Sequence, residues 1–253
     1  MRLALVSDIH GNTIALDAVI ADAGSMESAV DEWWALGDLA AIGPEPAGVL
    51  ERLSALPGLR VARGNTDRYA VGPDRPPPSH ADAMADPELW PLVVQVAESF
   101  AWTNGHLEAS GWHEWLAALP LELRTVLPDG SRLLGVHASP GRDDGRGVSP
   151  STPDEDVRQL VAGCDAEVVC VGHTHRPVDR LIDGVRVINL GSLSNPVGPD
   201  LRASYVIVDA DEVEVRIEHR RVEYDHEAFI DRVRRSHHPA ADYIISHQKG
   251  EKL

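Results

Sequence analysis

Short motifs rich in metal-binding side chains occur at five points along this chain. They are Asp8-Ile9-His10, Gly37-Asp38, Gly64-Asn65, Val136-His137 and Gly172-His173-Thr174-His175. Most of them follow a run of apolar residues typical of a buried strand. Burying aspartate, histidine and asparagine at strand ends is costly unless something charged satisfies them. Two aspartates, four histidines and one asparagine therefore predict a metal site.

The spacing within the motifs is suited to shared coordination. His173 and His175 are one residue apart and reach one site from a tight loop, in which Gly172 permits close approach of the backbone. Asp8 and His10 point the same way on extended backbone. Carboxylate and imidazole together favour Mn²⁺, Fe, Zn²⁺ or Ni²⁺ over Ca²⁺ or Cu(I). Seven donors exceed what one tetrahedral ion needs, and they suit two ions that share a bridging carboxylate.

The elements that must position these residues alternate between strand and helix in the first part of the chain. Apolar runs ending at residues 7, 36 and 62 predict strands, and residues 13–23 and 45–56 predict the helices between them. This order indicates parallel strands with helical crossovers. Ligands of such sheets gather at the carboxyl ends of the strands, where Asp8, Asp38 and Asn65 occur.

The rest of the chain predicts a helical excursion and a second sheet. Residues 72–80 are a proline-rich loop, and helices at 89–102 and 107–119 complete an excursion at about 72–119 that overhangs the site. Later strands and turns, such as Asp183-Gly184, indicate hairpins. The segment from about 226 to 253 is predicted to be a surface helix followed by a loose tail. We expect one domain, 1–253, of α/β class, with two sheets packed face to face.

Composition limits the function classes. The net charge of −17 argues against binding to nucleic-acid duplexes or anionic membranes, because both need a basic surface. No apolar run approaches the roughly 20 residues of a membrane span. The chain starts directly with a strand, without a signal-peptide pattern, and Cys164 and Cys170 are its only cysteines. These features predict a cytoplasmic protein, and they leave a homo-oligomer open.

The ordered motifs resemble the signature of the calcineurin-like metallophosphoesterases. The residues that carry the resemblance are Asp8-Ile9-His10-Gly11-Asn12, Gly37-Asp38, Gly64-Asn65-Thr66-Asp67, His137-Ala138 and Gly172-His173-Thr174-His175-Arg176-Pro177. The match is nearest to the small bacterial and archaeal phosphodiesterase-type branch and spans residues 2 to about 209. The resemblance implies a four-layer α/β/β/α sandwich of two mixed sheets flanked by helices, with a dinuclear metal centre.

Position by position, the resemblance assigns the ligands to two ions. Asp8, His10 and His175 would hold the first ion, Asn65, His137 and His173 the second, and Asp38 would bridge them. The expected ions are divalent transition metals, with Mn²⁺ first and Fe, Zn²⁺ or Ni²⁺ as alternatives. His173, Asp38 and Asn65 are also the expected catalytic residues.

One position departs from the family pattern. The family commonly has histidine after Gly-Asn, where it is credited with contacting phosphate or protonating the leaving group, and this chain has Thr66. Activity is therefore expected to depend on good leaving groups, or on protonation of the leaving group by water or by a group of the substrate. Arg63 and Arg142 are candidate phosphate contacts, and Asn12 and Thr66 are candidate substrate residues.

The function expected from the sequence is metal-dependent hydrolysis of small nucleotide-like or other phosphodiesters. Attack by a hydroxide that bridges the two metals would open the ester bond. The alternatives are a phosphomonoesterase, including protein phosphatase-like or dinucleoside polyphosphate hydrolase activity, and a non-catalytic metal-binding scaffold. The partner expected in each enzymatic case is a small phosphoester.

Overall fold

The computed structural model describes residues 1–249 of the chain, and in it β1 (Arg2–Val6) forms the centre of a five-stranded sheet. β1 pairs in parallel with β2 and antiparallel with β9. The full order is β10-β9-β1-β2-β3, with β2 (Glu32–Leu36), β3 (Arg60–Ala62), β9 (Ala203–Ala210) and β10 (Val215–Val222). The parallel β1-β2-β3 half follows from the predicted crossovers, which place the ends of β1, β2 and β3 at one edge.

A second mixed sheet has the order β4-β5-β6-β8-β7. Its central strands β5, β6 and β8 are parallel, and the outer strands β4 and β7 are antiparallel to their neighbours. The strands are β4 (Glu122–Val126), β5 (Arg132–Val136), β6 (Val168–Val171), β7 (Val178–Ile182) and β8 (Val185–Asn189). The Asp183-Gly184 turn joins β7 to β8, as the hairpin signal predicted.

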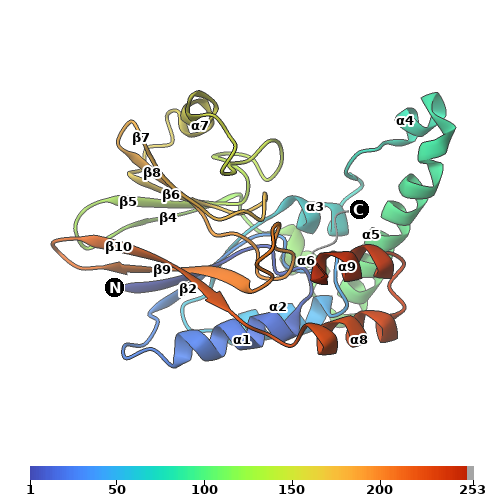
Figure 1. Cartoon of the computed structure of the whole chain (residues 1–253), viewed down its shortest axis with the longest axis horizontal. Helices are drawn as coiled ribbons and strands as arrows, with labels where there is room; N and C mark the ends of the chain where they lie inside the picture. The colour runs from blue at the N-terminus through green and yellow to red at the C-terminus, as the bar shows by residue number, and fades with distance from the viewer. Residues whose placement is uncertain (250–253) are drawn as a thin grey trace.

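Alternation of side chains along the strands builds the layers. In β1, Leu3 and Leu5 pack between the sheets with Trp34, whereas Ala4 and Val6 pack toward the helices. The helices on that outer face are α1 (Thr13–Gly24), α2 (Pro46–Ser54) and α8 (His226–Ser236), and α7 (Asp154–Val161) covers the second sheet. Figure 1 shows the resulting order of helices, sheet, sheet and helix. The predicted four-layer α/β/β/α sandwich is confirmed.

The helical excursion differs from the prediction. A single helix, α5 (Trp90–Ser110), replaces the two helices expected at 89–102 and 107–119, and α6 (His113–Ala117) follows it. The expected gap between these helices, at residues 103–106, does not occur because tertiary contacts hold the segment helical: Thr103 is buried and the Asn104 side chain donates to the Ala70 carbonyl at 2.9 Å. Figure 1 shows α4 (His80–Ala85) and the start of α5 projecting from the sandwich. α3 (Asn65–Val71) precedes the excursion, and a short 3₁₀ turn (Pro87–Leu89) lies between α4 and α5.

The segment after α8 also departs from the prediction. Residues expected as a loose tail form α9 (Ala241–Gln248), because Ile244 and Ile245 are buried in the core beneath the first sheet. The last four predicted tail residues, 250–253, lie outside the described residues. Within residues 1–249, no helix is both long enough and apolar enough to cross a membrane.

Candidate metal centre

The seven predicted ligands converge from both sheets. Asp8, Asp38 and Asn65 follow β1, β2 and β3 of the first sheet, and His137 follows β5 of the second. The loop after β6 carries His173 and His175. Because the sheets pack face to face, these strand ends meet at one edge of the sandwich.

Each of the four histidines is oriented by a backbone carbonyl. The Nδ1 atoms of His10, His137 and His175 lie 2.5, 2.7 and 2.7 Å from the carbonyl oxygens of Ala41, Leu36 and Asn195. His173 uses Nε2 instead, 2.9 Å from the Gly145 carbonyl. A carbonyl can only accept, so each of these nitrogens donates its proton. The other nitrogen of each neutral ring therefore presents a lone pair, which is the arrangement of metal-binding histidines.

Asp38 lies between two groups of these donors. Its Oδ2 is 3.9 Å from His10 Nε2, and its Oδ1 is 3.4 Å from His137 Nε2. The first group consists of Asp8, His10, Asp38 and His175, each with one ligand atom within 4.8 Å of the others. In the second group, Asn65 Oδ1 lies 3.1 Å from His137 Nε2 and 3.0 Å from His173 Nδ1. The two groups are the sets that the resemblance implies.

A divalent cation fits the unsatisfied atoms of the first group. Asp8 Oδ2 accepts from the Ser7 hydroxyl at 2.7 Å and from the His173 amide at 3.0 Å, whereas the buried Oδ1 has no hydrogen-bond donor. The nearest group to Oδ1 is His175 Nε2 at 3.1 Å, and its lone pair repels the carboxylate in the neutral ring. An orphaned carboxylate oxygen that faces imidazole lone pairs is satisfied by a metal ion.

The second group has the same shortage of donors. Asn65 Oδ1, His137 Nε2 and His173 Nδ1 all present lone pairs to one another. Rotating the Asn65 amide by half a turn would instead direct its NH₂ group at both imidazoles and at the Asp143 carbonyl, 3.2 Å away. A cation and the rotated amide are therefore alternative ways to satisfy this group.

The charged side chains of the site favour a cation between the ligands of these two groups. Burial disfavours the ionised form of Asp38, but His137 and His10 outweigh it and hold the pKa of Asp38 below its ordinary value. Burial by itself disfavours the charged form of His137, but the negative charges of Asp38 and Asp8 outweigh burial and raise the pKa of His137 to about 10. Without a metal, the carboxylates thus favour a second proton on His137, at the Nε2 atom whose lone pair would face a bound cation. Metal binding must release that proton.

The backbone at the site is left-handed, and the extended backbone expected for Asp8 and His10 is not found there. Five ligand residues have positive φ, in the left-handed region that costs non-glycine residues energy; the φ values are 55° for Asp8, 46° for His10, 55° for Asp38, 68° for His173 and 58° for His175. A Cβ atom on Gly172 would lie 1.9 Å from Ser7 Oγ and 2.6 Å from Asp8 Oδ2. Glycine is therefore required there for the close approach that the spacing predicted.

Asp67 links two of the ligand loops. Its carboxylate accepts from the backbone amides of Asp38, Leu39 and Gly64, each at 2.9 Å. These bonds tie the loop after β2 to the start of α3, and so they fix Asp38 relative to Asn65. Asn189, at the end of β8, acts similarly by donating to the Gly172 carbonyl at 2.6 Å.

Two of the four predicted substrate residues are engaged elsewhere in the fold. Asn12 is fully buried, where its Oδ1 caps α1 and its Nδ2 donates to Ser194 Oγ at 3.1 Å. Arg63 pairs with the buried carboxylate of Asp143 at 3.0 Å. Substrate contacts by these two side chains would have to break those interactions.

The other two predicted substrate residues are differently placed. Arg142 pairs with Asp144 at 2.7 Å, and its side chain is 64% exposed. Thr66 lies beside the metal centre, with its amide 2.9 Å from Asp38 Oδ1 and its hydroxyl donating to the Ala41 carbonyl at 3.3 Å. Of the four, Thr66 is the residue that the structure places against a ligand.

Residues that the sequence analysis did not select also surround the centre. Arg176 lines a cavity of about 320 Å³ together with His175. Gln248, in the last turn of α9, donates to the Ser194 carbonyl at 2.7 Å, and the Ser194 amide donates to the Asp8 carbonyl at 3.2 Å. Burial, followed by the nearby His175 and His10, lowers the pKa of the neighbouring His247 to about 4. Arg176 adjoins a recognised motif, but the approach of α9 depends on tertiary packing that no local sequence signal predicts.

A second, mainly apolar cavity of about 380 Å³ meets the centre on the side of Asn65 and Thr66. Most of its remaining lining comes from the excursion and the C-terminal segment, with one residue from the loop after β2 and one from α3: Ile42, Tyr69, Pro76, Pro77, Leu92, Gln95, Val96, Ser99, Phe100, Ala240 and Tyr243. The predicted overhang of the excursion thus takes the form of a wall beside the metal centre.

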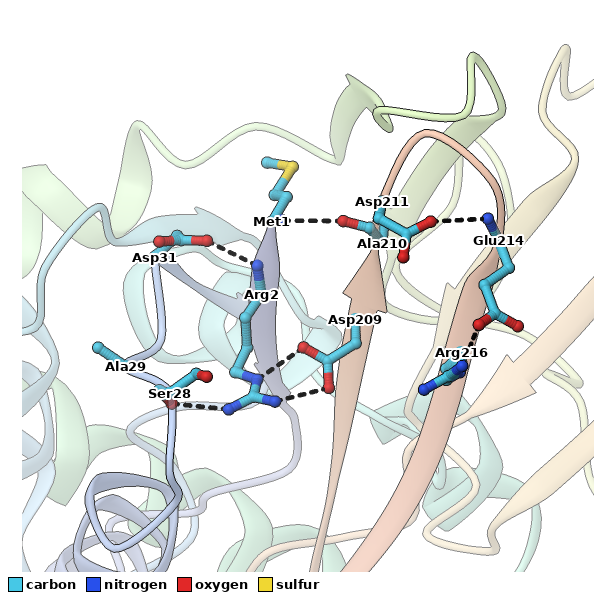
Figure 2. A pocket seen from close by; sticks show the side chains of 10 residues that line it. All are labelled: Met1, Arg2, Ser28, Ala29, Asp31, Asp209, Ala210, Asp211, Glu214 and Arg216. Atoms are coloured by element: carbon cyan, nitrogen blue, oxygen red, sulfur yellow. Dashed lines mark hydrogen bonds and ion pairs between the residues drawn. The ribbon is translucent and has the colours of Figure 1, made fainter.

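A third cavity, of about 410 Å³, lies at the opposite end of β1, beside Met1 and Arg2. Figure 2 shows that its polar groups bind one another. Arg2 pairs with Asp209 at 2.6 Å, and the terminal amine donates to the Ala210 carbonyl at 2.8 Å. These interactions leave it without the unsatisfied donors or acceptors that distinguish the metal centre.

Comparison with known proteins agrees with this geometry. A family model described as the calcineurin-like phosphoesterase superfamily domain matches residues 1–213. An uncharacterized protein from Methanocaldococcus jannaschii is 26% identical over 239 residues, which cover 88% of each chain.

Two solved structures share the fold. A hypothetical protein from Pyrococcus horikoshii OT3 has a TM-score of 0.79 at 22% identity, covering 100% of this chain and 99% of that one. A metallophosphoesterase from Sphaerobacter thermophilus has a TM-score of 0.74 at 24% identity, covering 99% and 98%. Both likenesses extend over the excursion and the C-terminal helices.

Proposed function

The chain belongs to the calcineurin-like phosphoesterase superfamily, and from this premise we propose that it is a phosphodiesterase that uses two divalent transition-metal ions. Membership implies a hydrolase of phosphoesters. The preference for small nucleotide-like or other diesters, the number of ions and the choice of Mn²⁺ are the finer parts of the proposal.

The orientation of the four histidines is the observation that carries the metal-dependent mechanism. Each ring donates one proton to a backbone carbonyl and turns its other nitrogen toward Asp8, Asp38 or Asn65. Divalent ions bound there would supply Lewis-acid activation of the phosphoester and a water that is nucleophilic at neutral pH. Asp38 would join the two halves of the centre, and Asn65 and His173 would complete the half nearest the apolar cavity.

The charge around the centre supports a diester. Arg63 and Arg142 already pair with Asp143 and Asp144, whereas Arg176 takes part in none of the ion pairs among residues 1–249. Of these three guanidinium groups, that of Arg176 has no carboxylate partner among the described residues, and a single guanidinium matches the one negative charge of a phosphodiester better than the two charges of a monoester. Thr66 provides no titratable group for the leaving oxygen, which favours substrates with stable leaving groups.

Metal-loaded protein assayed on two substrates with the same leaving group tests the proposal. We expect a higher kcat/KM for bis(4-nitrophenyl) phosphate than for 4-nitrophenyl phosphate, with activity lost on chelation and restored by Mn²⁺. Parallel loading with Zn²⁺, Ni²⁺ and Fe²⁺ ranks the metals. Undiminished hydrolysis by metal-free protein would overturn the mechanism, and a preference for the monoester would overturn the diester assignment.

A further inference from the structure

The cavity beside Asn65 and Thr66 has an uncharged, mainly apolar lining. None of its thirteen described lining residues carries a formal charge at neutral pH. Tyr69 and Phe100 meet edge to face, with ring centroids 5.6 Å apart, and Pro76 and Pro77 add further apolar surface. The cavity therefore differs in character from the metal centre that it adjoins.

Several polar groups of the lining are already satisfied within the protein. The Thr66 hydroxyl donates to the Ala41 carbonyl, and the buried Ser99 hydroxyl lies 3.4 Å from His238 Nε2. Burial raises the pKa of both the Tyr69 and the Tyr243 phenol, so both are neutral. A charged group entering this cavity would lose hydration without gaining a counter-ion among the lining residues.

Large apolar side chains remain exposed at this cavity. Leu92 of α5 is 46% exposed and Tyr243 of α9 is 40% exposed, although both contribute to the lining. Covering such surface releases water and is favourable. Since Asn65 belongs to both the cavity and the metal centre, a phosphoester held at the centre would have a neighbouring group within reach of this surface.

We propose that the cavity binds an uncharged, apolar ester group of the substrate, such as a substituted aromatic ring, while the phosphate is held at the metal centre. The inference rests on the proposed function and narrows its substrate class. A cavity of about 380 Å³ is large enough for such a group. No cationic side chain lines the cavity, which disfavours a second phosphate or an acidic peptide on this side. The guanidinium groups of Arg68 and Arg75 contact the Tyr69 and Phe100 rings, 4.8 and 5.6 Å from the ring centroids, but neither arginine belongs to the lining.

Binding of phosphonates to Mn²⁺-loaded protein tests the inference without turnover. Methylphosphonate, phenylphosphonate and 3-phosphonopropionate share one head group and differ in the group beside it. Isothermal titration should give about tenfold or tighter binding of phenylphosphonate than of methylphosphonate, as burial of part of a ring allows. The carboxylate of 3-phosphonopropionate should bring no gain over methylphosphonate.

Matched variants locate the effect. The Leu92→Ser/Tyr243→Ser pair should reduce the phenyl preference to below about threefold and leave methylphosphonate affinity unchanged. Val94→Ser is the control, because Val94 is 47% exposed on the same helix but does not line the cavity. Circular dichroism confirms that each variant is folded.

Two outcomes would overturn the inference and leave the proposed function standing. One is equal affinity of the wild-type protein for methylphosphonate and phenylphosphonate. The other is a loss of phenyl preference in the Val94→Ser variant as large as that in the Leu92→Ser/Tyr243→Ser variant. Failure of all three phosphonates to bind, together with no hydrolysis of bis(4-nitrophenyl) phosphate, would instead overturn the proposed function and the inference with it.

Discussion

At the scale of single residues, Asp38 is the side chain whose two oxygens face different halves of the centre. Oδ2 faces His10 and Oδ1 faces His137. We predict that Asp38→Asn lowers the metal content of the purified protein from about two ions per chain to less than one, since both halves lose the shared carboxylate. Elemental analysis after dialysis against Mn²⁺ measures the content.

His175→Gln is the comparison for Asp38→Asn. His175 belongs to the first group only, where its Nε2 lies 3.1 Å from Asp8 Oδ1. Its replacement should therefore remove about one ion and leave the half formed by Asn65, His137 and His173. If both variants lost the same single ion, Asp38 would not bridge the two groups.

Residue types and spacing predicted the ligands because each motif places its donors within a few residues of a strand end. The positions of Asp8, Asp38 and Asn65 follow directly from parallel strands that end at one edge. The ion-pair partners of Arg63 and Arg142 were not predictable. Arg63 pairs with Asp143, 80 residues away, and Arg142 pairs with Asp144, two residues away. Both pairs depend on how one loop folds over α3. The same holds for Gln248, which contacts Ser194 only through the packing of α9.

At the scale of elements, a polar cluster fastens α1 to the edge strands of the first sheet. Arg220 of β10 contacts both oxygens of Asp22, at 2.8 and 3.1 Å, and the Tyr205 hydroxyl of β9 donates to Asp22 at 2.6 Å. We predict that Asp22→Asn lowers the free energy of unfolding at pH 7 by about 1 kcal/mol, a modest value because the pair is partly exposed. Urea titration of the metal-free protein measures the change.

The same cluster has a definite pH dependence. The hydrogen bond from Arg220 outweighs burial and holds the pKa of Asp22 below its ordinary value of 3.8. The stabilisation is therefore fully present above that value and is lost as the pH falls through the lowered pKa. The difference between wild type and Asp22→Asn should shrink only below about pH 4.

Asp17→Asn provides the control on the same helix. Asp17 pairs with Arg52 at 2.7 Å, but its side chain is 54% exposed and it has no second partner among the described residues. Its loss should cost less than about 0.5 kcal/mol. An equal effect of the two substitutions would mean that the Asp22 cluster adds nothing beyond a surface ion pair.

The elements that the sequence predicted least well are stabilised by tertiary contacts rather than by local sequence preferences. Local propensity ends a helix near Gly105, yet α5 continues because Leu107 is buried and Asn104 bonds to α3. The polar composition after Tyr243 suggests a loose tail, yet Gln248 donates to the Ser194 carbonyl at 2.7 Å. Both segments lie beside the metal centre or the cavity that adjoins it. The sequence therefore predicted the metal ligands better than it predicted the elements that surround them.

At the scale of the whole molecule, the metal centre joins the two sheets. Asp8, Asp38 and Asn65 come from the first sheet, and the histidines of β5 and β6 come from the second. The distance between the sheets therefore sets the distance between ligands. His137 Nδ1 lies 2.7 Å from the Leu36 carbonyl, a direct link from β5 to β2 just before Asp38.

Gly135 controls the spacing of the sheets at this point. A Cβ atom there would lie 2.8 Å from Leu36 Cδ2 and 2.9 Å from Trp34 Cε3, across the interface. We predict that Gly135→Ala lowers the free energy of unfolding by about 1–3 kcal/mol through overpacking. Gly105→Ala, where an added Cβ meets nothing within 4 Å, should instead stabilise the protein by about 0.5–1 kcal/mol.

Gly135→Ala should also weaken metal binding, because Gly135 and Leu36 each lie two residues before a ligand. Pushing β5 from β2 would lengthen the 3.4 Å separation between His137 Nε2 and Asp38 Oδ1. Since rigid packing transmits small displacements, we expect Mn²⁺ titration of the folded variant to show reduced affinity, with Gly105→Ala unchanged. Destabilisation without any change in affinity would show that the sheets yield elsewhere, and that the spacing between them does not set the geometry of the metal centre.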